Sequence, residues 1–288
     1  MAAPEHIFDA RTRGCPAPID VALIYPALVL FALIGTVPFL WALATSVKAP
    51  VDAFAMPPVL FFRPSFAAYS QLLQDGQFAD YLLNSVIVTA GVVVLSTIVG
   101  CLAGYGLARY TGISSFALLT IALVLYALPR VSVLLPYYQI GQRSGLYDTK
   151  TLLVLVMVAA NQPFSIWIFE SFFREIPVQL EQAAMIDGCS RLQAFLRVVL
   201  PIAGPGMATT AIFSLLFAYN EFLLPVILAG PESSTMPVLI ANYAGSSDVS
   251  RWPLFAATAV LVALPLLVIV ITCQRFVIRG LVAGAVKG

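Results

Sequence analysis

The dipeptide Asn220-Glu221 places an amide and an ionisable carboxyl side chain in the middle of the apolar segment FAYNEFLLPVIL. An ionised side chain at the centre of a bilayer costs about 2.5–3.5 kcal/mol, so it should face protein or water rather than lipid. Two roles are compatible with this placement. Asn220 and Glu221 could line a polar path for a hydrophilic solute, or they could hold neighbouring helices or a partner subunit in register by hydrogen bonds. The residues by themselves leave both roles open.

Other residues that commonly carry chemistry are too few and too scattered to form a catalytic or metal site. The single histidine is His6, and the four cysteines, Cys15, Cys101, Cys189 and Cys273, have no metal-ligand spacing. The sequence contains no G-x-x-x-x-G-K-[ST] phosphate loop, and none of its three lysines follows a glycine. We therefore expect no catalytic residue, no metal ligand, no cofactor and no ATP site in this chain, which excludes enzymes that work alone.

The composition indicates an integral membrane protein. The mean hydropathy is +0.95, and charged residues make up only 10% of the 288 residues, against about 25% in soluble domains. A formal net charge of +1 excludes a strongly basic surface for nucleic acid.

Apolar segments long enough to cross a bilayer, about 20 residues each, occur six times. They cover 20–46, 83–108, 115–138, 151–173, 206–229 and 254–275. The sequence thus predicts an all-α polytopic membrane protein with six transmembrane helices, residues 20–275, between a tail at 1–19 and a tail at 276–288. The first apolar segment has no clear cleavage site, so we expect it to be retained as a membrane anchor.

The distribution of basic residues predicts the orientation. With six spans both termini lie on one side, and that side carries nine lysines and arginines, including Arg109. The opposite side carries six: Lys48, Arg63, Arg130, Arg143, Lys150 and Arg251. By the positive-inside rule, both termini are expected in the cytoplasm.

A row of small residues at a spacing of four marks the second predicted span. Ser96, Gly100 and Gly104 form the row, and Ala108 extends it. Small residues at this spacing allow close approach of two helix backbones within a membrane. The row indicates packing inside the chain, with contact to a second membrane subunit as the alternative.

A charged, proline-framed stretch separates the fourth and fifth predicted spans. Residues 178–187 favour a helix, Gly188 can adopt the positive φ that ends it, and Ser190 can cap a second helix that runs to about Leu200. Leu180, Ala183, Ala184 and Asp187 share one side of the first helix. We predict a helix–turn–helix at 174–205 on the cytoplasmic face. Its first helix is too short to be stable without support from its own chain or a partner.

This stretch resembles the EAA loop of the membrane subunits of ATP-binding-cassette (ABC) importers. The family pattern runs E-A-A, three residues, G, nine residues, I, one residue, L-P. Here Ala183-Ala184, Gly188, Val198 and Leu200-Pro201 occupy these positions in register. Gln182 stands at the glutamate position, after Glu181, and keeps the hydrogen bonding of that position but not its charge.

The resemblance extends over nearly the whole chain and is closest to the sugar-importer subclass. The segments RPSFAAYSQLL, LLNSVIVT, AGYGLARY and YNEF are similar to that subclass, and the ending QRFVIRGLVAGAVKG is similar to the carboxyl tail of MalG-type permeases. The resemblance implies the type I ABC importer fold, with two related permeases forming one translocation path.

The resemblance also implies which residues meet the partners. The EAA segment would be a coupling helix seated in a cleft of a cytoplasmic ATPase subunit, with the carboxyl tail inserted between two such subunits. The coupling contacts would be made by Glu181, Gln182, Ala183, Ala184, Asp187, Gly188 and Arg191, and the tail contacts by Arg279 and Lys287.

The function implied is that of a permease subunit in the bacterial cytoplasmic (inner) membrane, surrounded by membrane lipid. Its partners would be a second permease, two ATP-binding subunits that hold ATP and Mg, and an extracytoplasmic solute-binding protein. The substrate would be a sugar or polyol, with glycerol 3-phosphate or another small solute as the alternative. A stand-alone secondary transporter predicts ionisable residues distributed through the spans and a repeat between the halves, and the sequence has neither.

Overall fold

The computed structural model describes residues 18–53, 55–110, 112–245 and 248–285. It describes their side chains except those of 18–23, 249 and 273–285. Within these ranges the chain is helical, which confirms the all-α class. The helices are α1 (Pro18–Ser46), α2 (Pro50–Ala53), α3 (Ala67–Gln74), α4 (Gly76–Arg109), α5 (Ile113–Ala127), α6 (Val131–Ser144), α7 (Lys150–Glu175), α8 (Val178–Ile186), α9 (Arg191–Ala194), α10 (Leu200–Ile202), α11 (Gly204–Asn220), α12 (Leu223–Leu228), α13 (Met236–Ala244) and α14 (Trp252–Ala285). A π-helical turn, Phe195–Val199, joins α9 to α10, and a 3₁₀ turn, Val249–Arg251, precedes α14.

Four described helices are long and apolar enough to cross a membrane: Ile24–Ser46 of α1, then α4, α7 and Trp252–Thr272 of α14. Two bent pairs raise the number to six if each pair counts as one span: α5 with α6, bent by 94°, and Arg191–Ile202 with α11, bent by 73°. Six agrees in number with the sequence, but neither bent pair is a straight helix, and the second pair, 191–220, overlaps the predicted fifth span, 206–229, only in part.

The third predicted span, 115–138, is broken at its centre. Helix α5 ends at Ala127, Leu128 is extended at φ −63° and ψ 145°, and α6 begins only at Val131. Pro129 explains the break, because its ring excludes the helical conformation from the preceding residue and it has no N–H to donate.

The fifth predicted span, 206–229, is likewise interrupted. Helix α11 ends at Asn220, Glu221 is extended at φ −70° and ψ 122°, and the short α12 follows. Glu221 therefore lies at a break between two helices, and the sequence-based placement of this residue within a continuous helix was wrong. Its carboxylate oxygen Oε1 accepts hydrogen bonds from the backbone N–H groups of Leu223 and Leu224, which replaces the helical bonds lost at the break.

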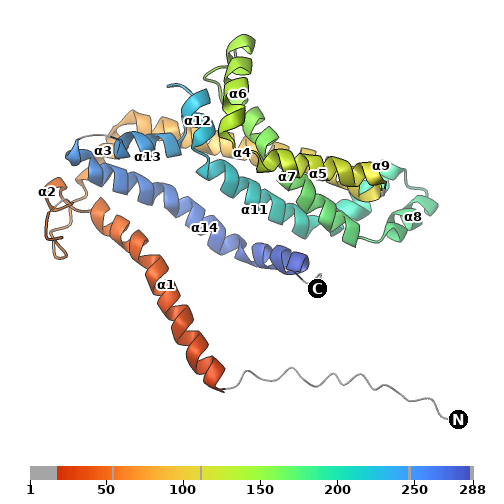
Figure 1. Cartoon of the computed structure of the whole chain (residues 1–288), viewed down its shortest axis with the longest axis horizontal. Helices are drawn as coiled ribbons and strands as arrows, with labels where there is room; N and C mark the ends of the chain where they lie inside the picture. Colours follow the sequence, from red (N-terminus) through yellow and green to blue (C-terminus); the bar gives the residue numbers. More distant parts are fainter. Residues whose placement is uncertain (1–17, 54, 111, 246–247, 286–288) are drawn as a thin grey trace.

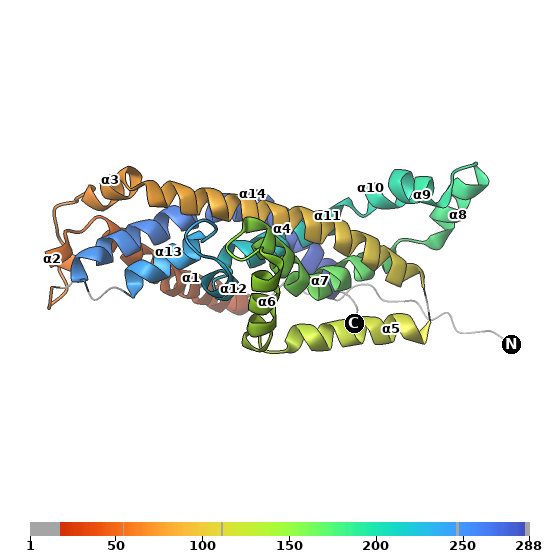
Figure 2. The same ribbon diagram turned by 90° about the horizontal axis from the view of Figure 1, so that it is seen from above.

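The helices α4, α7, α11 and α14 run lengthwise and form the body of an elongated molecule (Figures 1 and 2). One end carries α2, α3 and α13, and the opposite end carries α8, α9 and α10. Helix α6 projects from the body, and α1 leans away from it. The cytoplasmic helix–turn–helix of the sequence analysis thus stands at one extremity of the chain.

The central packing contact joins α4 to α7 along the row of small residues. Ser96 is fully buried, and a Cβ atom at Gly100 would lie 3.0 Å from Ser165 Cβ. A Cβ atom at Gly104 would lie 2.6 Å from Phe169 Cβ and 2.9 Å from the backbone nitrogen of Glu170. The row therefore packs within the chain, as the sequence indicated.

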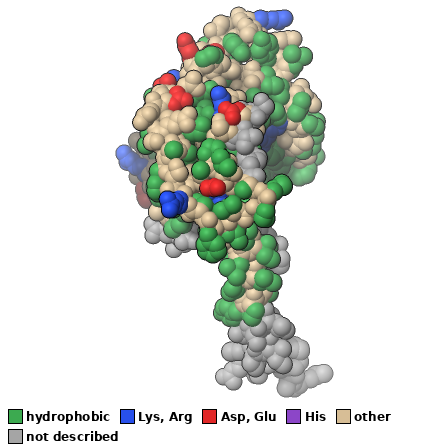
Figure 3. Space-filling view, turned by 90° about the vertical axis from the view of Figure 1, so that its left-hand side faces the viewer, with side chains coloured by type: hydrophobic (Ala, Val, Ile, Leu, Met, Phe, Trp, Pro, Cys, Tyr) green, Lys and Arg blue, Asp and Glu red, His purple; other side chains and the backbone are tan. Residues whose placement is uncertain are grey.

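The end that carries α2 and α3 differs in polarity from the surface of α1. Side chains of both charges gather on the end that carries α2 and α3, whereas hydrophobic side chains cover the projecting α1 (Figure 3). No residue in the most apolar window of α1 is buried, and only the carboxyl end of the helix, at Thr45 and Ser46, is buried against the chain. A helix that is apolar all round must be covered by lipid or by another membrane helix.

Candidate functional site

The predicted helix–turn–helix is present, with the predicted boundaries. Helix α8 begins after Pro177, and Gly188 has a φ of 92° in the turn that ends it. The Ser190 hydroxyl accepts from the backbone N–H of Gln193, and the Gln193 side chain accepts from the backbone N–H of Ser190, which forms a capping box. The second helix continues as α9, the π-helical turn and α10.

The carboxylate of Glu181 faces the chain itself rather than the surface of α8. Arg109 Nε donates to Glu181 Oε1 at 2.5 Å, and Arg109 Nη2 pairs with the same oxygen. The Tyr105 hydroxyl donates to Glu181 Oε2 at 2.9 Å, and Arg109 Nη1 donates to the carbonyl of Phe173 at 2.8 Å. With side-chain exposures of 15% for Arg109 and 8% for Glu181, this ion pair is shielded from water and joins α8 to α4 and α7.

An aromatic cluster surrounds this ion pair and joins the same elements. The Tyr105 ring lies edge-on to Phe173 at 5.6 Å and tilted against Phe195 at 4.5 Å, and Phe169 stacks on Phe173 at 6.0 Å. Buried aromatic pairs are worth about 0.5–1.5 kcal/mol beyond their area. The helix–turn–helix is therefore packed firmly onto the ends of α4 and α7.

The other predicted coupling residues divide into two groups. Ala184 is buried against the chain, whereas Gln182, Ala183, Asp187, Gly188 and Arg191 are exposed. Ala184 therefore does not share an exposed side with Leu180, Ala183 and Asp187, because the tether at Glu181 turns that part of α8 inward. The exposed group, together with Ile186 at 86% exposure, forms the surface that a partner can reach.

Sequence reasoning missed Tyr105 and Arg109 as members of this site. Arg109 was read only as a cation on the cytoplasmic side. The signal was present in AGYGLARY, where Tyr105 and Arg109 stand four residues apart and so project from one face of α4. Their partner lies 72 residues away from Arg109 along the chain, a separation that a local pattern does not bridge.

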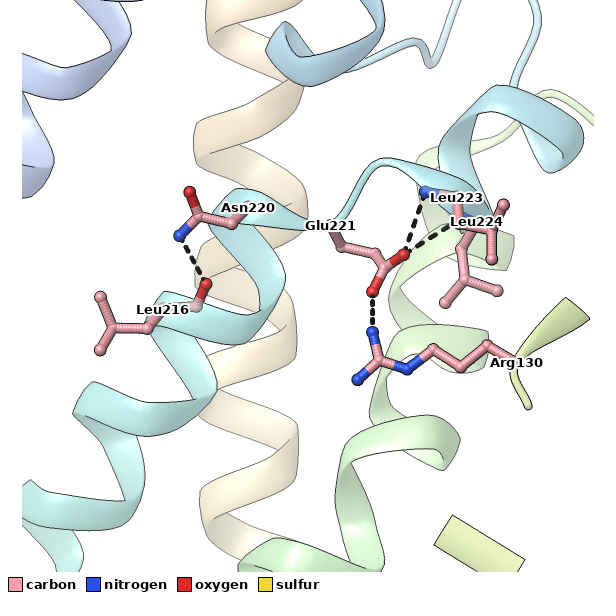
Figure 4. Close-up of polar contacts among 6 residues, drawn as sticks. All are labelled: Arg130, Leu216, Asn220, Glu221, Leu223 and Leu224. Atoms are coloured by element: carbon pink, nitrogen blue, oxygen red, sulfur yellow. Dashed lines mark hydrogen bonds and ion pairs between the residues drawn. The ribbon is translucent and has the colours of Figure 1, made fainter. Parts of the chain in front are cut away.

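The polar pair at the end of α11 does not converge on one point. Asn220 is exposed, and its amide nitrogen donates to the Leu216 carbonyl in its own helix at 2.8 Å. Glu221 is buried and points to the opposite side, where Arg130 Nη1 lies 2.5 Å from Glu221 Oε2 (Figure 4). The carboxylate that had no visible partner in the sequence is therefore half of an ion pair between the two broken spans.

A second cluster of hydrogen bonds, away from α8, joins the α6–α7 turn, α4 and the segment between α12 and α13. The Asp148 carboxylate, in the turn between α6 and α7, accepts from the backbone N–H groups of Gly230, Glu232 and Ser233 and from the Ser233 hydroxyl. The Asn84 amide of α4 donates to the carbonyls of Glu232 and Ser234. The segment between α12 and α13 is thus held from two sides.

Burial alone would raise the pKa of Asp148, but the hydrogen bonds from Ser233, Gly230 and Glu232 outweigh it and lower the pKa below the ordinary value of 3.8. The stabilisation from the ionised carboxylate is therefore complete above pH 3.8 and is lost as the pH falls through the lowered pKa. At neutral pH this clamp is fully formed.

We expect Asp148→Asn to loosen the segment between α12 and α13 and to lower the free energy of unfolding by about 1.5–3 kcal/mol, the worth of hydrogen bonds to a charged group. Asparagine tolerates the left-handed φ of 58° at this position, so the loss reports the carboxylate and not backbone strain. Amide hydrogen exchange in 229–235 measures the loosening. Asp75→Asn is the matched control, because Asp75 accepts one hydrogen bond, from Gln77, as the cap of α4. Equal exchange in both variants would contradict the clamp.

The same end carries a polar hollow of about 550 Å³. It is lined by Pro50, Gln71, Leu72, Asp75, Gln77, Tyr243, Asp248, Ser250, Arg251 and Leu254. These residues come from α2, α3, α13, the starts of α4 and α14, and the 3₁₀ turn with Asp248 before it. The hollow therefore lies at the extremity opposite α8.

The two predicted tail contacts, Arg279 and Lys287, lie at or beyond the end of the described residues. Arg279 lies within α14, with its side chain outside the described residues, and Lys287 lies outside them entirely. The tail at 1–17 is also outside the described residues.

Comparisons with known proteins agree with this architecture. Residues 96–282 match the family model for the binding-protein-dependent transport system inner membrane component. The probable ABC transporter permease protein y4oR of Sinorhizobium fredii is 34% identical over 90% of this chain and 92% of its own length. The trehalose transport system permease protein SugB of Mycobacterium tuberculosis is 34% identical over 87% and 92%.

The fold is shared with a chain from the crystal structure of a bacterial ABC transporter involved in the import of the acidic polysaccharide alginate. The TM-score is 0.76 at 21% identity, over 89% of this chain and 96% of that chain. With the matched family model covering both the helix–turn–helix and the broken fifth span, the chain belongs to the family of inner membrane permease components of binding-protein-dependent ABC transport systems.

Proposed function

We propose that this chain forms half of the translocation path of an ATP-driven importer for a sugar or a related polyol. A second permease would form the other half, two cytoplasmic ATPase subunits would supply the energy, and an extracytoplasmic protein would deliver the solute. One observation carries the proposal. The Glu181–Arg109 ion pair attaches the helix–turn–helix to α4, and the outer surface of the helix–turn–helix is exposed.

The solute class rests on the relatives. Curated relatives that are similar to this chain are named for the transport of trehalose, of trehalose and maltose, of diacetylchitobiose and of sulfoquinovosyl glycerol. Three of these four names denote neutral sugars, and the fourth denotes an anionic one. Glycerol 3-phosphate or another small solute is the alternative.

The proposed orientation rests on the basic residues of the two sides. The end with α8, α9 and α10 would face the cytoplasm together with both termini, because the sequence assigns nine lysines and arginines to that side and six to the other. The opposite end, with its polar hollow and charged surface, would receive the solute-binding protein.

The mechanical requirement on the coupling surface is a stiff connection to the spans. A ligand shifts a conformational equilibrium only by its differential affinity for the two states. The movement of the closing ATPases can therefore shift the transmembrane helices only if α8 transmits it without bending. The capping box, the aromatic cluster and the Glu181–Arg109 pair supply this stiffness within the chain. The exposed residues Gln182, Ala183, Asp187, Gly188 and Arg191 would contact the ATPase, whereas Ala184 and Glu181 would hold the helix in place.

A reconstituted complex tests the proposed function. The chain, purified from membranes through an affinity tag, is expected to bring with it a second permease and an ATPase subunit. In proteoliposomes, the loaded binding protein is expected to raise ATP hydrolysis with one solute of a panel of trehalose, maltose, diacetylchitobiose, sulfoquinovosyl glycerol and glycerol 3-phosphate. Solute uptake by the chain alone, without an ATPase subunit, would contradict the proposal and favour a secondary transporter.

A further inference from the structure

Two breaks in the transmembrane helices meet at one ion pair. Arg130 stands where α5 turns by 94° into α6, and Glu221 stands where α11 ends before α12. The breaks are 91 residues apart in sequence, and the contact between Arg130 Nη1 and Glu221 Oε2 at 2.5 Å joins them directly. Broken transmembrane helices survive where the freed backbone groups are buried in protein or line a cavity.

The two partners of this pair are buried to very different degrees. The Glu221 side chain is 4% exposed, and both its oxygens are engaged, one by Arg130 and the other by the backbone of α12. The Arg130 side chain is 40% exposed. Glu221 therefore serves as an internal anchor, while part of the guanidinium faces out of the chain.

The guanidinium is also held by an aromatic ring. Its central carbon lies 4.8 Å from the ring centre of Phe217, which lies in the last turn of α11, four residues before Glu221. Ion pair and ring together fix the orientation of a planar group that carries five N–H donors, of which one is used in the bond to Glu221. The remaining N–H donors can bind a ligand without further ordering of the Arg130 side chain.

A half-exposed guanidinium between spans cannot face lipid without a large cost, so its open side must face water, a solute or a polar partner. The geometry points to a solute-contact site formed by Arg130 on its Phe217 support, in the translocation path of this subunit. This inference rests on the proposed function, because it places the solute of that function on the Arg130 side of α11 and not on the Asn220 side.

The charge of the site selects the class of solute. Because Glu221 already neutralises Arg130, the pair carries no net charge, and an anionic solute at the remaining N–H donors would be repelled by the nearby carboxylate of Glu221. Hydroxyl groups of a neutral sugar or polyol can accept from the remaining N–H donors while the ion pair stays intact. The site therefore favours neutral polyhydroxylated solutes over anionic ones.

Cysteine accessibility tests the location without knowledge of the solute. In the full complex, with the four native cysteines of this chain replaced, Arg130→Cys, Phe217→Cys, Asn220→Cys and Ile121→Cys are exposed to a membrane-impermeant methanethiosulfonate reagent. The Phe217→Cys variant keeps the ion pair, so it reports the path even if Arg130→Cys fails to assemble. Ile121 lies on the exposed apolar face of α5 and serves as the lipid-facing control.

Labelling at positions 130 and 217 is expected to be about tenfold faster than at 121, in the nucleotide-free or the vanadate-trapped complex, because only water-lined positions form the reactive thiolate readily. Labelling at 220 without labelling at 130 and 217 would place the path on the other side of α11 and overturn the inference. Equal, slow labelling at 130, 217 and 220 would mean that another subunit covers Arg130, and would also overturn it.

The neutral double variant Arg130→Gln/Glu221→Gln tests the contact itself, because it leaves no unpaired charge. It is expected to lower the ratio of solute transported to ATP hydrolysed by about tenfold, as expected when a site loses its directed donors. Unchanged uptake per ATP would show that the pair is only a structural link between the two breaks.

In the solute panel, stimulation of ATP hydrolysis by a neutral sugar supports the neutral class, and stimulation by an anionic solute alone contradicts it. A complex that lacks an ATPase subunit would instead refute the proposed function.

Discussion

Glu181→Gln is expected to uncouple ATP hydrolysis from solute uptake and to destabilise the chain by about 3–5 kcal/mol, the cost of leaving one member of a buried ion pair without its partner. The substitution keeps the shape of the side chain but leaves the guanidinium of Arg109, at 15% exposure, without a countercharge. Tyr105 and the Phe173 carbonyl remain as neutral partners and replace only part of the lost interaction. Helix α8 should then move independently of α4.

Two measurements separate the effects. The midpoint of thermal unfolding of the purified complex reports stability, and the ratio of solute transported to ATP hydrolysed in proteoliposomes reports coupling. Glu175→Gln is the matched control, because Glu175 is exposed at the end of α7, and surface substitutions change the free energy of unfolding by about 0.5 kcal/mol or less.

The charge exchange Arg109→Glu/Glu181→Arg gives the sharper result. If the ion pair connects α8 to α4, the exchange should recover part of the coupling ratio that either single reversal loses. If Glu181 instead acts by contacting the ATPase directly, the exchanged pair should be as defective as Glu181→Arg alone. Coupling that is normal in Glu181→Gln would show that the buried pair is not the connection.

Gly104→Ala is expected to force α4 and α7 apart and to lower the free energy of unfolding, although alanine is the better helix former. The gain in helix propensity is about 1 kcal/mol. The added Cβ atom would lie 2.6 Å from Phe169 Cβ, 2.9 Å from the Glu170 nitrogen and 3.1 Å from the Ile166 oxygen. Two of these atoms belong to the backbone of α7 and cannot rotate away, so the overpacking cost, about 1–3 kcal/mol or more, exceeds the gain.

Gly106→Ala supplies the opposite result in the same helix. A Cβ atom at Gly106 meets nothing within 4 Å, so only the propensity gain remains and the variant should be as stable as the parent or more so. Gly104→Leu, with a longer side chain, should prevent assembly of the complex, measured as loss of the co-purified ATPase subunit. A Gly104→Ala protein with the thermal midpoint of Gly106→Ala would show that the two helices approach less closely than described.

The two predictions concern one mechanical unit. Gly104 lets α4 lie against α7, and five residues later on α4 Arg109 receives Glu181 from α8. A force applied to the exposed surface of α8 thus enters α4 through the ion pair and is shared with α7 through the glycine contact. The Arg130–Glu221 pair joins the breaks of the third and fifth spans and is the proposed point of contact with the solute.

The sequence alone determined the elements whose causes are local. Apolar length predicted the number of membrane spans, and small residues four apart predicted close helix packing within the chain. Pro177, Gly188 and Ser190 predicted the limits of the two short helices. Each of these follows from residues within one or two helical turns, where backbone propensity and capping act. The pattern of Ala183, Ala184 and Gly188 also predicted the family that the comparisons confirm.

Only the tertiary structure decided the partners of the charged side chains. Glu181 was predicted as a contact for another subunit, but it is buried against Arg109, and Glu221 was predicted within a helix, but it lies at a break and binds Arg130. An ion pair depends on which side chains the fold brings within a few ångströms, and these partners are 72 and 91 residues apart. Local spacing determines the face on which a charge stands, but only the packing of distant helices determines the charge that it meets.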